Sequence, residues 1–376
     1  ALVLFGLFLT ITTNAQINRT LETKVADILA QYPTKSNEYA GQLSQKIIDL
    51  GAEGIAQFTN MLVPQGQGDD TQVRYAIGSL AHYAAAPGRD AARNLVETAL
   101  LKAIGNTKNI EVKTFLIRRL NYCATDASVE TLGGFLTNKK LSSPIIGVLT
   151  SVGSEKAGSA LLEGIQYKNT QNEIIKALGV IKYEKALIEL TNLAASNDKE
   201  TQKEALYALS KIGAPQSKTL LFEAVKKAKF TVSNDDATIA YIEYARNLGV
   251  NGNKDLCREV CGEIIENSKS ENQWDVRSAA YSILRENFGN EITKALLKEA
   301  KNTRNKKYRK AIFNEAVKGM TSNEVNLWLK VFKKLSNEGK AQLLNALAHR
   351  QEEIVLTKGI LPALEDKDET LRIEAI

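Results

Sequence analysis

Apolar and polar residues in the stretch 201–224 recur with the period of amphipathic helices. The apolar side of the first helix comprises Ala205, Leu206, Leu209 and Ile212. Its polar side comprises Lys203, Glu204, Tyr207, Ser210 and Lys211. Gly213 can adopt the left-handed conformation that ends a helix, and Pro215 begins the turn into a second helix. Because one such pair cannot cover both of its apolar sides, the pattern predicts further pairs stacked against it.

The same order of apolar positions recurs upstream and downstream of this stretch. Turn positions lie about 30 residues apart at Ala124, Gly153, Lys182 and Gly213, a spacing typical of stacked helix pairs. Further along the chain, the next two turns are predicted at Gly249 and Gly289. No segment of the run alternates with the period of two that a strand requires. The sequence therefore predicts an all-α fold, an α-solenoid or superhelix of helix-pair repeats.

The repeats resemble HEAT repeats, in particular the short bacterial kind in which ALxxIG closes the first helix, here residues 208–213. The segment LVPQGQGDDTQVRYAIGSLAHYAAAPG, residues 62–88, is similar to the start of the HEAT array in secreted proteins of Bacteroidetes-type bacteria. In some of those proteins the array precedes a 3-keto-disaccharide hydrolase-type domain. The resemblance covers nearly the whole chain after residue 16 and implies a fold rather than an activity, because helical repeats serve as scaffolds with many uses.

The beginning of the chain reads as an export signal. Residues 1–15 are uncharged and mostly apolar, and Thr13, Asn14 and Ala15 form a small-residue cleavage site, so the mature chain would start at Gln16. The basic n-region of a signal peptide is missing, which predicts a natural chain that begins earlier. A membrane anchor is the alternative, but the run is shorter than the roughly 20 residues of a spanning helix; a buried helix is another. The protein is expected to be periplasmic or secreted, with no membrane span.

The remaining chain divides into two predicted regions. Residues 16–69 are helical without the turn signature of the repeats, as in the atypical terminal units of solenoids, and are predicted to form an N-terminal cap. Residues 70–376 form the HEAT-like array. Its last helix, from Thr370, stops after about two turns with Leu371 and Ala375 uncovered. A helix this short is marginal in water, so a longer native chain is predicted.

Residues with the potential for chemistry are sparse. His82 and His349 lie in different repeats, and the sequence lacks the motifs of zinc proteases and serine hydrolases and the paired cysteines of zinc sites. Cys257 and Cys261 are four residues apart on one predicted helix, where a disulfide would be strained, so they are read, with Cys123, as buried small residues. No catalytic residue, metal site or cofactor site is assigned.

Two further features are assigned to structure. The glycine-rich loop 64–70 has Asp69 and Asp70 where a phosphate loop needs Lys, so Asp70 is expected to cap the helix that carries Val73, Ala76 and Leu80. Trp274 and Trp328 lie in apolar helical patterns, which favours core packing over sugar stacking.

One region is strongly basic. Residues 294–340 contain 13 Lys or Arg and 4 Asp or Glu, a balance of +9, whereas the whole chain carries +6. The cations concentrate around Tyr308, at Lys301, Arg304, Lys306, Lys307, Arg309 and Lys310. A solvated helix start explains such a run, and a polyanion-binding site is the functional alternative. An exported protein meets little nucleic acid, so an anionic glycan or an acidic partner is the expected ligand.

The sequence thus favours an exported, non-catalytic HEAT-repeat scaffold that binds a protein partner or a cell-envelope glycan. Two alternatives remain open. The chain could be the non-catalytic part of a larger carbohydrate-processing enzyme of the 3-keto-disaccharide hydrolase type, as the resemblance implies, and the full-length chain would then be an enzyme. It could instead be a polyanion-binding module.

Overall fold

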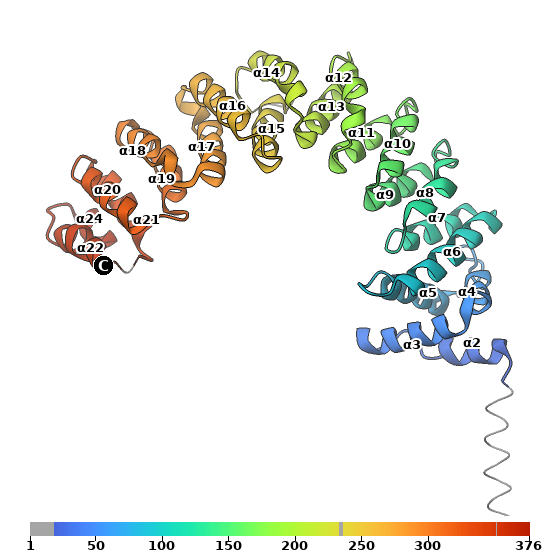
Figure 1. The fold of residues 1–376 in the computed structure, drawn as a ribbon. Coiled ribbons are helices and arrows are strands. Elements are labelled where there is room, and N and C mark those ends of the chain that lie inside the picture. The colour runs from blue at the N-terminus through green and yellow to red at the C-terminus, as the bar shows by residue number, and fades with distance from the viewer. Residues whose placement is uncertain (1–18, 233–235, 351) are drawn as a thin grey trace, which may run out of the picture. The chain divides into compact units, whose positions relative to one another are not determined.

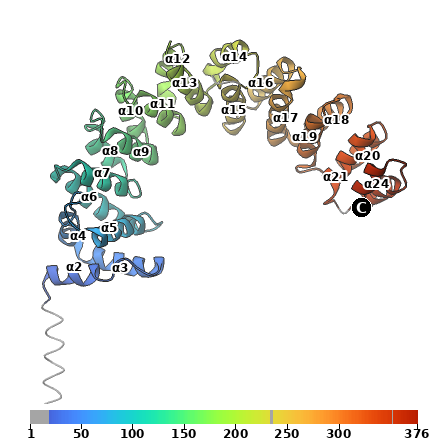
Figure 2. The same ribbon diagram turned by 180° about the vertical axis from the view of Figure 1, so that it is seen from behind.

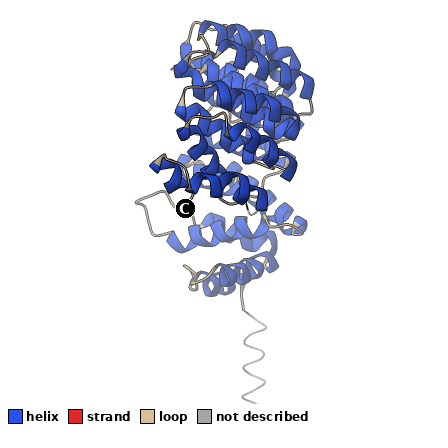
Figure 3. Ribbon diagram, turned by 90° about the vertical axis from the view of Figure 1, so that its left-hand side faces the viewer, coloured by secondary structure: helices blue, strands red, loops and turns tan. Residues whose placement is uncertain are grey.

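The computed structural model describes residues 19–232, 236–350 and 352–376. Every regular element within these ranges is a helix and none is a strand (Figure 3). Residues 1–15, for which the sequence predicts a signal peptide, lie outside the described residues. Across the described ranges, no helix is both long and apolar enough to cross a membrane. The chain divides into two compact units, Ala1–Ile181 and Lys182–Ile376.

The first unit consists of helices arranged in two rows (Figure 1). In one row, each of the following helices packs against the next: α3 (Asn37–Asp49), α5 (Thr71–Ala84), α7 (Ile110–Leu120), α9 (Ser142–Val152) and α11 (Gln171–Val180). The other row contains α2 (Leu21–Leu29), α4 (Gly51–Asn60), α6 (Asp90–Asn106), α8 (Asp126–Gly133) and α10 (Glu155–Gly164). The interface between the rows holds the apolar core, for example Leu43, Ile55 and Ile77, which are almost fully buried.

The second unit repeats the same plan. Its first row is made of α13 (Lys199–Ile212), α15 (Ala237–Val250), α17 (Trp274–Phe288), α19 (Lys306–Val317), α21 (Asn337–Leu347) and α24 (Glu369–Glu374), each packed on the next (Figure 2). The second row is made of α12 (Leu187–Ala194), α14 (Lys218–Lys227), α16 (Lys254–Asn267), α18 (Thr293–Asn302), α20 (Ser322–Phe332), α22 (Glu353–Val355) and α23 (Leu361–Leu364). Short 3-10 turns enter several of these helices: η1 (Glu184–Ala186), η2 (Pro215–Ser217), η3 (Glu271–Gln273) and η4 (Gly289–Ile292). A π-helical turn, η5 (Leu356–Ile360), joins α22 to α23. The predicted all-α solenoid of helix pairs is confirmed.

The helix pair formed by α13 and α14, which contains residues 201–224, has the predicted form. Leu209 is fully buried in α13, and Gly213 ends that helix with φ +67°, in the left-handed region. The assignment of Glu204 and Ser210 to the polar side was wrong, because both side chains are buried. Ser210 avoids an unsatisfied hydroxyl by donating a hydrogen bond to the Tyr207 carbonyl at 2.7 Å, within its own helix.

One predicted turn is misplaced. Gly249 lies inside α15, and the chain turns three residues later at Gly252, where φ is +84°. Gly249 is small for a different reason: a Cβ there would lie 2.4 Å from the Asn287 side chain of α17. The other predicted turns are found, and Lys182 adopts the left-handed conformation, with φ +53°, where Gly153 and Gly213 supply it in neighbouring repeats.

The loop before α5 differs from its prediction in detail. Asp70 occupies the position before α5, but its carboxylate accepts from the Val63 N–H and pairs with Arg74, and makes no cap hydrogen bond. Asp69 accepts from the Thr71 N–H instead. The predicted apolar face of α5 is confirmed, since Val73, Ala76 and Leu80 are buried.

The cysteines and tryptophans lie mostly in the core. Cys123, Cys257 and Cys261 are buried free thiols, as expected from the sequence. Trp328 is fully buried against Phe313, with ring centroids 5.6 Å apart. Trp274, at the first turn of α17, is only partly buried.

Candidate functional site

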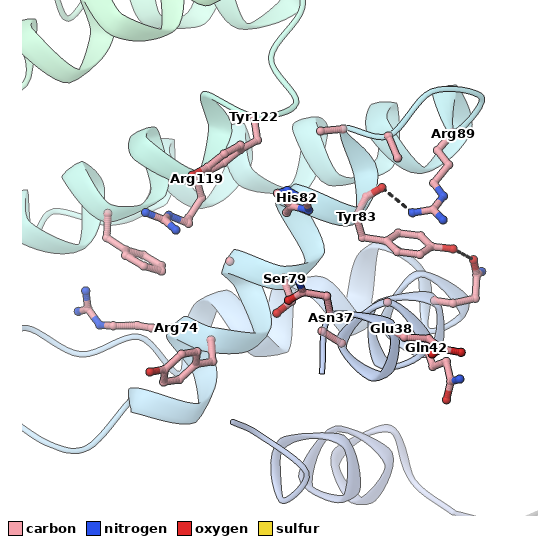
Figure 4. A pocket seen from close by; sticks show the side chains of 18 of the residues that line it. Asn37, Glu38, Gln42, Arg74, Ser79, His82, Tyr83, Arg89, Arg119 and Tyr122 are labelled. Atoms are coloured by element: carbon pink, nitrogen blue, oxygen red, sulfur yellow. Dashed lines mark hydrogen bonds between the residues drawn. The ribbon is translucent and has the colours of Figure 1, made fainter. Parts of the chain in front are cut away.

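A groove of about 1300 Å³ runs over α3, α5 and α7 in the first unit (Figure 4). Small residues make room for it: Gly41 on α3, Gly78 on α5, and Ala85 and Ala86 at the end of α5 all line it. A Cβ at Gly78 would lie 3.5 Å from the Arg119 guanidinium, and one at Gly41 would lie 3.6 Å from the Tyr83 ring. A side chain longer than a methyl group at either position would therefore extend toward one of these two groove residues.

Arg74 is the cation of the groove that is fully engaged by the protein itself. Its Nε donates to Asp70 at 2.8 Å, and Nη1 and Nη2 donate to the two oxygens of Glu111 at 2.8 and 2.9 Å. The hydrogen bond with Glu111 is the main reason why the pKa of Arg74 is raised. This bidentate pair joins α5 to α7, so we assign Arg74 to positioning rather than to ligand binding.

Arg119 of α7 lines the groove close to two aromatic rings. Its guanidinium lies between two rings, 5.4 Å from the centroid of Phe115 and 5.7 Å from that of Tyr122. Its Nε is buried without a hydrogen-bond partner, and no carboxylate of the described residues forms an ion pair with it. Arg119 as a whole is half-buried and lines the groove, so a ligand there can reach its guanidinium.

The other end of the groove holds a second stacked cation. The Arg89 guanidinium lies 3.5 Å from the centroid of the Tyr83 ring and donates to the Tyr83 carbonyl at 3.0 Å. The Tyr83 hydroxyl in turn donates to Gln45 of α3 at 2.6 Å. Figure 4 shows Arg119 and Tyr122 on one side of His82, and Tyr83 and Arg89 on the other.

The carboxylates of the groove do not neutralise these two arginines. Among the described residues that line the groove, Glu38 of α3 is the one acidic side chain, and it is exposed. The carboxylates of Asp70 and Glu111 are occupied by Arg74. The groove therefore presents cations, aromatic edges and side-chain amides such as Gln42 and Gln45.

Groups with catalytic potential do not converge in the described residues. His82 is exposed and packs edge-on against Tyr122 with centroids 6.0 Å apart, and His349 is exposed in the other unit. No group of three metal-ligating side chains occurs within the described ranges. Burial raises the pKa of the Cys123 thiol to about 12, and a hydrogen bond with Cys257, with burial second, raises that of Cys261, so both thiols are protonated and inert at neutral pH.

The basic cluster predicted from the sequence is mostly exposed. Lys301, Arg304, Lys306, Lys307 and Lys310 are exposed around the junction of α18 and α19. Lys306 pairs with Glu338 of α21 at 2.7 Å.

Arg309 has to be removed from this cluster. Its side chain is only 7% exposed, and it donates to the Thr303 carbonyl at 2.7 Å. Tyr308, at the centre of the run, is fully buried, and its hydroxyl donates to Glu299 at 2.8 Å. These two residues anchor α19 to α18, so they are unavailable to a polyanion.

The sequence did not single out the groove, although two of its signals were present. Phe115, Arg119 and Tyr122 recur at spacings of four and three residues, which places them on one face of a helix. The short run of small residues in α5 contains Gly78 and Ser79. What the sequence could not reveal is that these residues face one another across α5 and α7.

One protein-family model matches part of the chain. The family model for HEAT repeats matches residues 159–241. The chain contains a HEAT-repeat region. No curated protein matches the chain.

Several solved structures align with most of the chain at low sequence identity. An engineered protein from a structural genomics consortium is 17% identical, with a TM-score of 0.33 over 94% of this chain and 97% of that chain. A Kap121p mutant is 10% identical, with a TM-score of 0.47 over 94% of this chain and 48% of that chain. Importin beta is 11% identical, with a TM-score of 0.46 over 90% of this chain and 53% of that chain. The chain spans about half the length of the Kap121p and importin beta structures.

Proposed function

We propose that this protein is a non-catalytic HEAT-repeat scaffold and that the groove over α3, α5 and α7 binds a partner protein. The observation that supports this most directly is the stacked, uncompensated guanidinium of Arg119 on the wall of the groove. A guanidinium that lines a groove without a protein acceptor is available to pair with a carboxylate of a bound molecule.

The size of the groove favours a chain segment over a small metabolite. Small-molecule sites enclose roughly 300–1,000 Å³ and surround their ligand. This groove has a volume of about 1300 Å³, is open along one side and is lined from three successive helices of one row. Stacked helices create extended binding surfaces of this kind, which suit a segment of another protein.

The proposal is tested by blocking the groove. In Gly78→Leu the new side chain occupies the space beside Arg119. The matched control is Gly105→Leu on α6, where a Cβ meets no atom within 4 Å and the residue is exposed. Random displayed peptides are selected on the full chain, and their affinities for the three proteins are measured by fluorescence anisotropy.

We expect the selected peptides to bind the parent and Gly105→Leu equally, and to bind Gly78→Leu at least about tenfold more weakly, which corresponds to about 1.4 kcal/mol. Failure to select any peptide would overturn the proposal. Equal binding to all three proteins would do so as well.

Export is a further part of the proposal. It is supported by the apolar run and the small-residue cleavage site in residues 1–15. Expression of the chain behind a complete start region in a bacterium, followed by N-terminal sequencing of the exported product, should yield Gln16 as the first residue. An intact N-terminus in the cytoplasmic fraction would contradict it.

Two alternative functions are each supported by one observation. The five exposed cations of α18 and α19 support a polyanion-binding surface in the second unit. The similarity of residues 62–88 to secreted Bacteroidetes-type arrays supports a role beside a 3-keto-disaccharide hydrolase-type domain. The second alternative predicts hydrolase activity in a longer gene product, with the repeats contributing binding alone.

A further inference from the structure

We infer that the groove selects an acidic, extended peptide segment, with Arg119 as the residue that binds a carboxylate of the partner. The inference rests on the proposed function and adds the chemistry of the occupant. It starts from the difference between the three arginines of the groove, since Arg74, Arg89 and Arg119 are engaged to different degrees.

Arg119 has the geometry of a carboxylate receptor. A guanidinium presents its donors as a planar fork that matches the two oxygens of a carboxylate. The Arg119 guanidinium lies 5.4 Å from the centroid of Phe115 and 5.7 Å from that of Tyr122, and no described side chain or carbonyl accepts a hydrogen bond from it.

Arg89 provides a second cation at the opposite end of the groove. Its Nη1 donates a hydrogen bond to the Tyr83 carbonyl, and no carboxylate of the described residues pairs with it. Figure 4 places His82 between the two arginines. A ligand that satisfies both cations must therefore extend along α5 and carry negative charge at more than one point, as an extended acidic segment does.

The groove also carries groups that suit a peptide backbone and its apolar side chains. Gln42 on α3 adds an exposed amide group that can pair with peptide N–H and C=O groups. Tyr75, which is 53% exposed at the groove, offers a ring for an apolar side chain of the segment.

The charge on Arg119 can be removed against a close control. Arg118 is the preceding residue on α7, carries the same charge, is exposed and does not line the groove. Arg119→Gln and Arg118→Gln therefore change the net charge equally and differ in which side chain is lost. Arg119→Lys keeps the charge but removes the planar fork, so it separates charge from geometry.

The experiment uses the full chain and four labelled probes, with binding measured by fluorescence anisotropy at fixed salt. Three are synthetic peptide pools of one length: one with Asp at alternate positions, one with Asn in place of each Asp, and one with phosphoserine in place of each Asp. The fourth is an oligosaccharide of uronic acid. Circular dichroism and the melting temperature of each variant confirm that it folds.

We expect the Asp pool to bind at least about tenfold more tightly than the Asn pool. Arg119→Gln should weaken binding of the Asp pool by about tenfold or more, Arg119→Lys should weaken it less, and Arg118→Gln should change it less than about threefold. If Arg119→Gln does not fold, the comparison of Arg119→Lys with Arg118→Gln carries the test.

The outcomes separate this inference from the proposed function. If the Asp and Asn pools bind alike and Arg119→Gln has no effect, while Gly78→Leu still weakens binding of the selected peptides, the groove is a protein site but its acidic selectivity is refuted. Tighter binding of the phosphoserine pool would replace the carboxylate with a phosphate. Tighter binding of the uronate would overturn the assignment of a peptide.

Discussion

Gly213 and Asn247 touch where consecutive repeats of the second unit meet: a Cβ on Gly213 would lie 2.8 Å from the Cβ of Asn247. The Asn247 side chain accepts a hydrogen bond from Lys182 at 3.0 Å. One helical turn later, Asn251 donates to the Ile212 carbonyl at 2.9 Å, which satisfies an acceptor at the end of α13. Glycine at 213 therefore serves both the helix end and the packing of the next helix.

Gly213→Ala is expected to destabilise the protein through both effects. The left-handed φ of +67° costs an alanine about 1–2 kcal/mol, and the close contact with Asn247 adds about 1–3 kcal/mol. The control is Gly252→Ala, because Gly252 also has a positive φ, +84°, but no atom within 4 Å of its Cβ position. Urea unfolding followed by circular dichroism should show the larger loss for Gly213→Ala; equal losses would mean that Asn247 moves aside freely.

Gly213 also shows which features of the fold could be predicted from the sequence. The pattern of apolar residues ending in glycine predicted α13, its end and its buried face, because helical period and helix termination are local properties. The prediction failed at Gly249, since two glycines lie three residues apart and only the contact with Asn287 distinguishes a packing glycine from a turning one. Glu204 and Ser210 were misassigned for a related reason, because the neighbouring helices that bury them are not visible in local spacing.

The groove could not be predicted from the sequence, because its residues become a site only when neighbouring helices are placed together. In the sequence, His82 is separated from every other residue with catalytic potential, so it indicates no site on its own. Arg119 becomes informative only when its lack of a carboxylate partner is known, which requires the positions of α5 and α7 together. For the basic run around Tyr308, the sequence shows the number of charges directly. It does not show that Arg309 is buried.

The buried ion pair between Arg285 and Glu324 makes stability depend on pH. Burial alone would raise the pKa of Glu324, but hydrogen bonds from Thr293, the Thr321 N–H and Arg285 outweigh it, and the pKa is lowered. The distance from Arg285 Nη1 to Glu324 Oε1 is 3.1 Å, and both side chains are almost fully buried. Arg285 also donates to the Ala316 and Lys318 carbonyls, so the pair joins α17 to α20 and to the end of α19.

A carboxyl whose pKa is lower in the folded state stabilises that state above its unfolded pKa of about 4.3, and this stabilisation disappears as the pH falls through the folded value. Glu324→Gln should cost about 3–5 kcal/mol at pH 7, because it leaves Arg285 buried without a counterion. Urea unfolding at several pH values should show the difference between the parent and Glu324→Gln shrinking below about pH 4. A difference that stays constant down to pH 3 would show that the carboxylate is not the stabilising group.

The basic cluster makes a prediction about polyanions that excludes Arg309. The quadruple variant replaces the exposed cations Arg304, Lys306, Lys307 and Lys310 with Gln. Its control removes four exposed lysines of the first unit, Lys35, Lys46, Lys139 and Lys140, in the same way. If the cluster is a site, heparin affinity should fall by at least about tenfold in the first variant alone, with a weaker salt dependence.

Equal heparin binding by both quadruple variants would show that the cluster is not a polyanion site. Its cations would then be explained as the solvated start of a helix. Arg309→Gln tests the burial of that residue separately. It should lower the melting temperature, because it removes the hydrogen bond to the Thr303 carbonyl. Intact folding of that variant together with weaker heparin binding would place Arg309 back among the exposed cations.

Hydrogen exchange tests most directly whether the groove is the binding site. The full chain is incubated with the tightest-binding selected peptide, and deuterium uptake along the chain is measured by mass spectrometry with and without that peptide. We expect slower exchange in α3, α5 and α7, because the occupant covers the row of helices that carries Gly41, Gly78 and Arg119. Protection confined to α18 and α19, with unchanged exchange in α3, α5 and α7, would contradict it.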